Sequence, residues 1–339
     1  MKKKITIYDI AKKLNITAAT VSRALNDNPK ISPKTRALVK ATAEKMNYEQ
    51  NRLALALKSG KSNTIGVIVP RIDRDFFSTI IKGIEDELYP HGYHIIICQT
   101  YDQKEREIEN ITTLLNTQVD GILMSVSNSM VETSELQRIL NKNVPLIFFD
   151  RKRDMSGVST VTINDFEGGY KATEHLIRTG CKRIAHLTVD RTLEIYKLRF
   201  EGYKKALQDN GIKFNKSYVM EAGNSYDEGK KAIGKLLKLR KPPDAIFSSS
   251  DYIALGTIQG LKAKGYKIPE DFCVVGFSNE PFTKFMELSI SSVDQFPLEM
   301  GKTTARVFLE QVNNKNNVYI EKKVVITPKL HIRMSSSKD

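Results

Sequence analysis

Residues 8–23 read YDIAKKLNITAATVSR, which is the layout of a helix, a tight turn and a second helix. Asn15 stands at the turn, where the backbone needs a positive φ that Asn tolerates better than most residues. The pattern extends over residues 5–46 and predicts a compact head of three helices. The apolar face of its first helix consists of Ile7, Ile10, Ala11 and Leu14.

Hydroxyl residues mark where these helices begin. Thr6 is placed to cap the first helix, with Asp9 near its positive end, and Thr17 is placed to cap the second. Ser32 with Pro33 starts the third helix, because Pro is favoured at the first helical position. We expect the apolar stripe of the third helix to consist of Ala37, Leu38, Ala41 and Met46.

The positive charge of the chain is concentrated in this head. Residues 1–62 contain 14 basic and 4 acidic side chains, a net charge of +10, whereas the other 277 residues contain 39 basic and 35 acidic side chains, a net charge of +4. A strongly basic module attached to a nearly balanced remainder indicates nucleic-acid binding.

The second helix is the expected reader of DNA sequence. A recognition helix enters the major groove with its N-terminal residues toward the bases. Ala18 and Ala19 can touch thymine methyl groups, and Arg23 can bind a guanine edge with two hydrogen bonds. The remaining candidates in the head suit phosphate or water-bridged contacts; they are Thr6, Tyr8, Thr17, Thr20, Ser22 and Asn26.

A short apolar helix is predicted just after the head. It is capped by Asn51, ends at Gly60, and is too short to be stable alone in water. An apolar side chain such as Leu57 can wedge between base steps in the minor groove, although an ordinary linker role for the leucines is the alternative. The DNA-binding candidates of this hinge are Asn51, Arg52, Ala54, Leu57 and Lys58.

Residues 5–60 resemble the head and hinge of the lactose-repressor/galactose-repressor (LacI/GalR) family of bacterial transcription regulators. The resemblance implies that Leu57 from each of two subunits is the minor-groove wedge. It also implies that Ala18, Ala19 and Arg23 occupy the base-reading positions. The segments that carry it are residues 8–11, 20–23, 39–46, 47–48 and 51–54, together with Leu57.

From Ile65 onward, short apolar runs alternate with amphipathic segments. The runs at residues 65–70, 94–98, 121–124 and 144–150 form one series, and those at 183–187, 245–248 and 272–277 form a second. Buried strands separated by helices predict parallel sheets. Two doubly wound units in series predict two lobes with a ligand-binding cleft at the carboxyl ends of their strands.

This body resembles the core of the same family, which is similar to periplasmic sugar-binding proteins. The resemblance reaches about Met334 and implies three crossings between lobes, near residues 161–164, 291–294 and 324–327. The expected domains are a helix-turn-helix head (1–50), a hinge (51–61), an N-lobe (about 62–161 and 294–325), a C-lobe (about 162–293 and 326–334) and a tail (335–339).

Polar side chains at the predicted strand ends are the candidates for binding an effector. Carboxylates, an arginine and aromatic faces suit a hydroxyl-rich sugar. Taken singly, each residue fits a capping or lobe-stabilising role equally well. Ser278 and Asn279 stand where many relatives carry Asp, which weakens any inference about a specific effector. The set is Asp75, Phe76, Phe77, Ser125, Asp150, Asp251, Ser278 and Gln295, with Arg199 matching the ligand-binding arginine of the family. Ser250, next to Asp251, is a further polar residue at the same strand end.

Several classes of protein do not fit the sequence. The three cysteines and five histidines have no metal-ligand spacing, and no nucleophile stands with a base. No apolar run reaches the roughly 20 residues that span a membrane. Lys2–Lys4 resemble a signal-peptide start, but the polar residues at positions 8, 9, 12 and 13 interrupt the apolar region. We therefore predict a cytoplasmic protein that is not an enzyme and has no cofactor or metal.

The sequence predicts a DNA-binding transcription regulator, most simply a repressor, that binds a near-palindromic operator as a homodimer. A small molecule, expected to be a sugar, would control its affinity for the operator. The sign of the response stays open. The alternatives are a sugar-binding module without a DNA role, a regulator that answers to a protein co-effector, and an enzyme on a doubly wound fold.

Overall fold

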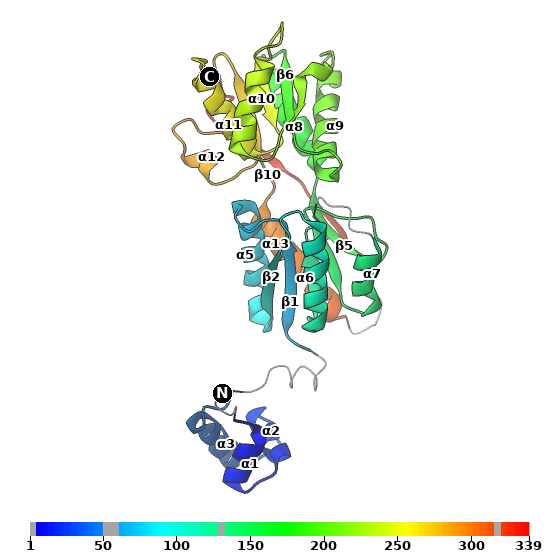
Figure 1. Cartoon of the computed structure of the whole chain (residues 1–339), viewed down its shortest axis with the longest axis vertical. Coiled ribbons are helices and arrows are strands. Elements are labelled where there is room, and N and C mark those ends of the chain that lie inside the picture. Colours follow the sequence, from blue (N-terminus) through cyan, green and yellow to red (C-terminus); the bar gives the residue numbers. More distant parts are fainter. Residues whose placement is uncertain (1–4, 50–60, 128–132, 315–319, 339) are drawn as a thin grey trace. The chain divides into compact units, whose positions relative to one another are not determined.

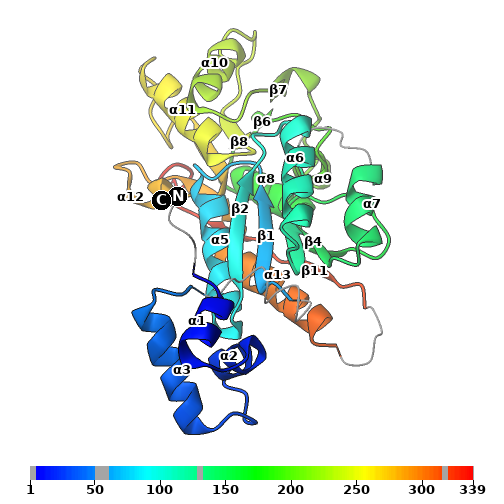
Figure 2. The same ribbon diagram turned by 60° about the horizontal axis from the view of Figure 1, so that its bottom comes forward.

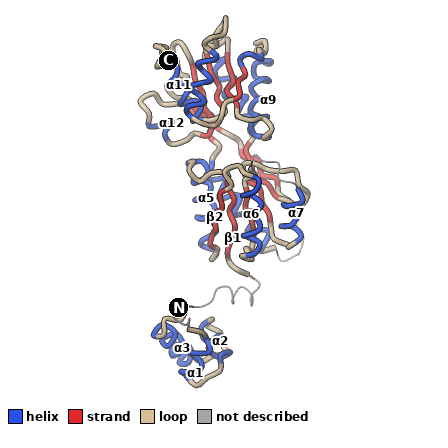
Figure 3. The backbone as a smooth tube through the Cα atoms, viewed as in Figure 1, coloured by secondary structure: helices blue, strands red, loops and turns tan. Residues whose placement is uncertain are grey.

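The structure is a computed structural model that describes residues 5–49, 61–127, 133–314 and 320–338. The chain divides into two compact units, residues 1–62 and 63–339 (Figure 1). The first unit is helical and the second combines helices with strands (Figure 3). The hinge candidates Asn51, Arg52, Ala54, Leu57 and Lys58 lie outside the described residues.

The first unit contains α1 (Ile7–Leu14), α2 (Ala18–Leu25) and α3 (Pro33–Lys45). Two of the predicted capping residues are confirmed here: the Thr17 hydroxyl accepts from the backbone N–H of Thr20 (3.1 Å), and the Ser32 hydroxyl accepts from that of Thr35 (3.2 Å). Asn15 has a φ of 52°, as the turn requires. The helix-turn-helix layout of residues 8–23 is therefore present.

The core of the first unit differs from the sequence prediction in its third helix. Helix α3 buries Val39, Thr42 and Ala43, and Met46 packs against them, whereas Leu38 is 55% exposed. Positions 39, 42, 43 and 46 are spaced as i, i+3, i+4 and i+7, so they lie on one face of the helix. The predicted stripe of Ala37, Leu38, Ala41 and Met46 is wrong except for Met46.

One sheet of the second unit has the order β11-β5-β4-β3-β1-β2, with every neighbouring pair parallel. Together with its helices we call it the N-lobe. Its strands are β1 (Thr64–Val69), β2 (His94–Gln99), β3 (Gly121–Met124), β4 (Leu146–Phe149), β5 (Ser159–Ile163) and β11 (Lys323–Ile326). Its helical elements are α5 (Asp75–Leu88), η1 (Tyr89–His91), α6 (Lys104–Asn116), α7 (Thr133–Asn141) and α13 (Pro297–Val312).

Helices cover both faces of the N-lobe sheet. Alternate residues of each strand point to opposite faces, so each strand contributes side chains to two cores. Ile65, Val67 and Val69 of β1 pack in the core that includes α5 and α13, whereas Ile68 packs in the core of α6 and α7 (Figure 2). Continuous burial along β1 therefore explains the unbroken apolar run that predicted a parallel strand.

The other sheet has the order β12-β10-β9-β8-β6-β7 and is parallel except for the β10–β12 pair. We call it, with its helices, the C-lobe. Its strands are β6 (Ile184–Thr188), β7 (Val219–Glu221), β8 (Ala245–Ser248), β9 (Cys273–Ser278), β10 (Ser291–Asp294) and β12 (Lys329–His331). Its helical elements are α8 (Asp165–Arg178), α9 (Glu194–Asp209), η2 (Lys216–Tyr218), α10 (Tyr226–Leu236), α11 (Asp251–Lys262) and α12 (Phe282–Phe285). The fold class predicted from the sequence is confirmed.

The chain changes from one sheet to the other after β5, after β10 and after β11. The last change ends in the C-lobe, where Ser335 and Ser336 are buried. The Ser335 hydroxyl donates to the carbonyl of Val274 on β9 (2.6 Å), and Ser336 bonds to Ser291 on β10 (2.6 Å). These two serines, which belong to the predicted tail at residues 335–339, therefore pack against the second sheet.

Helices α8 and α9 pack at close range because glycines stand at their contact. A Cβ on Gly202 of α9 would lie 2.1 Å from the carbonyl oxygen of Phe166, and one on Gly169 of α8 would lie 2.3 Å from that of Arg199. Only glycine leaves room for this approach. The close packing holds the first turns of α9, including Arg199, against α8.

We predict that Gly202→Ala forces α8 and α9 apart and lowers the free energy of unfolding by about 1–3 kcal/mol. The measurement is the urea midpoint of the full chain. Gly234→Ala is the matched control, because a Cβ at that position of α10 meets nothing within 4 Å. Alanine is the better helix former, so the control should be neutral or stabilising. Equal midpoints for the two variants would contradict the packing argument.

Candidate functional site

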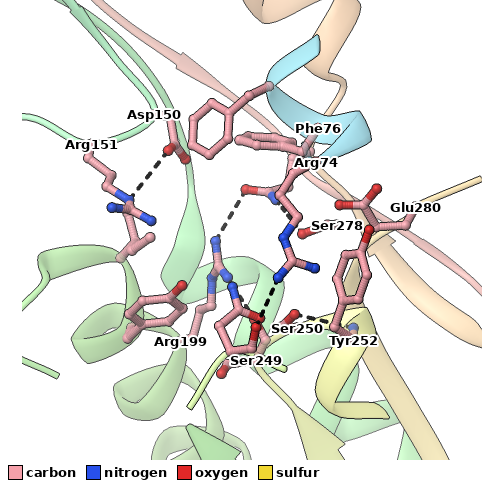
Figure 4. Close-up of a pocket in the computed structure, with 15 residues that line it drawn as sticks. Arg74, Phe76, Asp150, Arg151, Arg199, Ser249, Ser250, Tyr252, Ser278 and Glu280 are labelled. Carbon is pink, nitrogen blue, oxygen red and sulfur yellow. Dashed lines mark hydrogen bonds and ion pairs between the residues drawn. The ribbon is translucent and has the colours of Figure 1, made fainter. Parts of the chain in front are cut away.

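A cavity with an empty volume of about 440 Å³ lies between the two lobes (Figure 4). Most of its walls follow the carboxyl ends of strands β1, β4, β8, β9 and β10, the edge where open parallel sheets bind ligands. The lining residues are Arg74, Phe76, Phe77, Asp150, Arg151, Ile195, Tyr196, Arg199, Asn224, Ser249, Ser250, Tyr252, Ser278, Glu280 and Gln295.

Arg199 is the most extensively bonded side chain of the cavity and is 3% exposed. Its Nε donates to Asp165 Oδ1 (2.7 Å), one terminal nitrogen donates to the Ser249 carbonyl (2.9 Å), and the other donates to Gln295 Oε1 (3.2 Å). The guanidinium also lies over the ring of Phe277, 3.7 Å from its centre. These contacts fix the guanidinium plane before any ligand arrives.

Burial controls the charge of the carboxylate that supports Arg199. It raises the pKa of Asp165 from 3.8 to about 6, against the opposing effect of the Arg199 guanidinium. Burial also raises the pKa of Asp150, against the positive charges of Arg151 and Arg199. The guanidinium groups beside both carboxylates oppose this effect and favour the ionised forms.

The N-lobe wall is built around Asp150. The Ser125 hydroxyl donates to Asp150 Oδ2 (3.1 Å), and Arg151 donates to Asp102 Oδ1 (2.7 Å). Asp150 has a φ of 58° and Ser278, on the opposite wall, a φ of 116°. Non-glycine residues rarely adopt such angles, and strained backbone of this kind concentrates at ligand-binding sites.

Two side chains cross between the lobes in opposite directions. Arg74 of the N-lobe donates to the carbonyl of Asn224 (3.2 Å) and lies over the ring of Tyr252, 3.8 Å from its centre, both in the C-lobe. Glu280 of the C-lobe accepts a hydrogen bond from the backbone N–H of Phe76, at the N-terminal end of α5. Together they join the two lobes along one edge of the cavity (Figure 4).

An ion pair joins the lobes at a second place. Lys152 follows β4 in the N-lobe and lies 2.8 Å from Glu194, the first residue of α9 in the C-lobe. A hollow of about 820 Å³ surrounds this pair and shares Arg151 and Ile195 with the cavity. The two hollows therefore adjoin one another.

Six of the predicted effector candidates line the cavity and three do not. Asp75 is exposed at the start of α5, and Ser125 is buried behind Asp150 in the N-lobe wall. Asp251 is buried behind the C-lobe wall. Asp251 accepts from the Ser292 hydroxyl (2.6 Å) and from the backbone N–H of Glu280 (2.8 Å). The residues that the structure brings together are Phe76, Phe77, Asp150, Arg199, Ser278 and Gln295.

Sequence reasoning missed eight lining residues. Five of them lie beside a residue that the sequence singled out, so including the neighbours of each candidate would have found them; they are Arg74, Arg151, Ser249, Tyr252 and Glu280. The other three come from a loop or from the start of α9, and no local signal marks them; they are Ile195, Tyr196 and Asn224.

The predicted DNA-contact residues between positions 6 and 26, which the structure describes, are all exposed or half-buried. Tyr8 is 71% exposed, and Ala19 and Arg23 are exposed on α2. Four of the polar candidates are bonded locally: the Thr6 hydroxyl donates to Asp9 Oδ2 (2.7 Å), the Thr17 and Thr20 hydroxyls share a hydrogen bond (2.9 Å), and Asn26 donates to the Ser22 carbonyl (2.7 Å). Arg23 is therefore the most freely presented polar group of the helix.

Among the described residues, no group of three or more His, Cys, Asp or Glu side chains is placed to hold a metal ion. Within the same part of the chain, no helix is both long enough and apolar enough to cross a membrane.

Two family descriptions match the chain. Residues 6–51 match "Bacterial regulatory proteins, lacI family", and residues 62–333 match "Periplasmic binding proteins and sugar binding domain of LacI family". Catabolite control protein A of Priestia megaterium is 32% identical over 313 residues, covering 92% of this chain and 93% of the relative. The HTH-type transcriptional regulator DegA of Bacillus subtilis is 31% identical over 335 residues, 98% of each chain.

Solved structures show the same architecture. A LacI family transcriptional regulator from Enterococcus faecium with bound ribose has a TM-score of 0.73 at 28% identity, covering 81% of this chain and 98% of the other. The complex of the regulator CelR with cellobiose has a TM-score of 0.73 at 26% identity, and the match covers 98% of this chain and 100% of the other. The lac repressor dimer bound to operator has a TM-score of 0.86 at 23% identity, and the match covers 98% of this chain and 99% of the other. At this identity the similarity shows the fold alone.

Burial, together with the negative charges of Asp251 and Asp75, raises the pKa of Glu280 from 4.5 to about 7. The folded protein therefore holds this proton more tightly than the unfolded chain does. Its stability falls as the pH rises from about 4.5 to about 7, and above pH 7 the whole cost of the buried charge is present. Glu280→Gln removes that charge, so we predict about 1–3 kcal/mol greater stability than the unchanged protein at pH 8.

The two proteins should be equally stable near pH 4, where Glu280 is protonated in both the folded and the unfolded chain. Urea unfolding at the two pH values measures the difference. Glu201→Gln, an exposed position of α9, is the control and should show no pH-dependent gain. A variant that is less stable than the unchanged protein at pH 8 would contradict this account of Glu280.

Proposed function

This chain belongs to the LacI family of bacterial regulatory proteins, and we propose that it is a repressor whose operator affinity is set by a sugar bound between its lobes. It is a DNA-binding transcription regulator with an effector-binding domain, as the family is. One observation supports the choice of effector site: the cavity at the carboxyl ends of both sheets combines fixed polar groups with aromatic faces.

The proposed reader of the operator is α2. Ala18 and Ala19 offer methyl groups to thymine, and the exposed Arg23 offers a planar fork of donors to guanine. Thr6, Tyr8, Thr17, Thr20, Ser22 and Asn26 are proposed to contact phosphates or bridging waters. The hinge roles of Asn51, Arg52, Ala54, Leu57 and Lys58 remain part of the proposal, since those residues lie outside the described ranges.

The proposed effector contacts follow from the donors and acceptors in the cavity. Arg199 can donate to a hydroxyl, Asp150 can accept from one, and the rings of Phe76 and Phe77 can cover an apolar ring face. Ser278 and Gln295, which are bonded to each other (2.9 Å), supply further polar groups. Ribose and cellobiose are the ligands in two similar structures, which supports a sugar here.

The proposed mechanism is allosteric. An effector that touches both walls favours one separation of the lobes, because its contacts differ between the open and closed arrangements. In a homodimer on a near-palindromic operator, a change in lobe separation would alter the spacing of two heads. We propose that the protein acts in the cytoplasm through these binding equilibria and not through catalysis.

Selection of operators from a random pool of DNA duplexes tests the DNA role. We expect the full chain to enrich a near-palindromic site, with an affinity that falls steeply with salt, at a log–log slope of roughly −0.9 per neutralised phosphate. No enriched site at moderate salt, with sugar binding still present, would show that the chain is a binding module without a DNA role.

Arg23→Ala tests the proposed base reader. Loss of a bidentate contact to guanine should weaken binding to the selected operator by about 1–3 kcal/mol and relax the preference at one base pair. Arg138→Ala is the matched control, since Arg138 is exposed on α7 and pairs with Glu135. Fluorescence anisotropy with matched and single-mismatch duplexes measures both effects. If Arg23→Ala behaves like the control, the assignment of α2 is wrong.

A further inference from the structure

Three guanidinium groups line the cavity, and they differ in their counter-ions. Arg199 is paired with Asp165 (2.7 Å) and Arg151 with Asp102 (2.7 Å). Arg74 has no carboxylate within 4.0 Å among the residues that the structure describes, because its neighbour Asp73 pairs with Arg71 instead (2.6 Å). A guanidinium beside a cavity without its own carboxylate is suited to an anionic ligand.

Arg74 is also held in a fixed orientation. Its contact with the Asn224 carbonyl (3.2 Å) and its stacking on Tyr252 (3.8 Å) set the plane of the guanidinium across the cavity's edge. The Nε atom of Arg74 is buried and has no hydrogen-bond partner in the described structure. An orienting stack together with an unused donor describes a prepared binding group.

The unused polar atoms of the cavity are mainly donors. In the described part of the chain, the buried atoms without a hydrogen-bond partner include Arg74 Nε, Arg151 Nε, Ser249 Oγ and Glu280 Oε2, all on lining residues, although Arg151 Nε also lies 3.8 Å from Asp150. The two guanidinium nitrogens can only donate and the hydroxyl can donate. Glu280 is 5% exposed and, when protonated, donates as well. Buried polar atoms need partners, so this set calls for a ligand rich in acceptors.

Glu280 would oppose an anion only while it is ionised. The charged and titratable groups around it are Arg74 and Asp75 at the start of α5, and Asp251 and Tyr252 at the start of α11. Burial raises the pKa of Glu280 to about 7, so it takes up a proton close to neutral pH. An anion bound beside it favours the protonated form further.

The hollow next to the cavity also favours negative charge. The adjoining hollow is lined by four basic side chains and two acidic ones. Such an excess of one sign raises the local concentration of oppositely charged ligands. The basic residues are Arg151, Lys152, Arg153 and Lys197, and the acidic ones are Asp154 and Glu194.

We propose that the effector is a sugar carrying an anionic group, a carboxylate or a phosphate, and that Arg74 binds that group. The inference rests on the proposed function and narrows it to one chemical class. Arg199, Asp150 and Gln295 would still bind the hydroxyl groups of such a sugar. Arg74 is then the residue that distinguishes an acidic sugar from its neutral counterpart.

Titration calorimetry of the full chain with matched sugars tests the class. The probes are glucose, glucuronate, gluconate and glucose 6-phosphate; galactose and galacturonate; and ribose and ribose 5-phosphate. We expect an anionic member to bind and its neutral counterpart to bind at least tenfold more weakly. Comparing the affinities for the sugar acids with those for the sugar phosphates identifies which anionic group the protein prefers. A neutral sugar that binds more tightly than its acidic counterparts, or no binding by any anionic member, overturns the inference.

Arg74→Gln tests the residue. Loss of a charge-assisted contact should weaken binding of the anionic sugar roughly 10- to 100-fold and leave the affinity for the neutral counterpart nearly unchanged. Arg178→Gln is the matched control, since Arg178 lies on α8, pairs with Glu174 (3.0 Å) and does not line the cavity. An equal loss for acidic and neutral sugars would overturn the assignment of Arg74, because it would indicate a structural role only.

The pH dependence supplies a readout that a structural role would not move. Affinity for the sugar carboxylate should fall by up to about tenfold per pH unit above pH 7, because Glu280 must then be reprotonated or repel the ligand. Glu280→Gln should abolish this dependence and bind more tightly than the unchanged protein at pH 8. An affinity that rises with pH would overturn the proposal.

Operator binding separates this inference from the proposed function. If an anionic sugar binds but leaves operator affinity unchanged, the proposed effector role fails and the ligand class stands. If a neutral sugar alone changes operator affinity, the regulator stands and the ligand class is wrong.

Discussion

The buried guanidinium of Arg199 is the interaction on which the cavity depends. It joins α9 to Asp165 at the start of α8, to the backbone after β8 and to Gln295 after β10. Asp165 and Gln295 each lie just beyond a point where the chain leaves one sheet for the other. Removing one partner of a buried ion pair costs about 3–5 kcal/mol, so this group fixes both the C-lobe wall and two of the crossings. Gly169 and Gly202 make it possible by allowing α8 and α9 to approach.

This arrangement gives the two lobes few ways to move independently. The crossings after β5, β10 and β11 connect them covalently, while Arg74, Glu280 and the Lys152–Glu194 pair connect them across the cleft. A ligand that replaces or strengthens those contacts has a different affinity for different lobe separations, which is the requirement for an allosteric response. In this proposal, some of the side chains that contact the ligand also join the two lobes.

Much of the fold could be predicted from periodicity and caps. Thr17, Ser32 and Asn15 act locally, so their roles follow from neighbouring residues, and the continuous apolar run at Ile65 marks a strand buried on both faces. Helix α13 was not predicted, because its core face mixes Gly301, Thr304 and Ala305 with large residues. At the site, polar residues after strands were visible in the sequence. Arg74 and Glu280 adjoin residues that the sequence singled out, but their own roles were not predicted, because these roles depend on contacts across the lobes between residues far apart in the chain.

The central claim is that the cavity and the DNA-binding head are energetically coupled. Coupling between two binding sites is reciprocal, so an effector that changes operator affinity by some factor must have its own affinity changed by the same factor when operator is bound. The most direct measurement is calorimetric titration of the effector into the free full-length protein and into the protein saturated with its selected operator. The account predicts two dissociation constants whose ratio equals the ratio of operator affinities with and without effector. Identical effector affinities in the two states would contradict it.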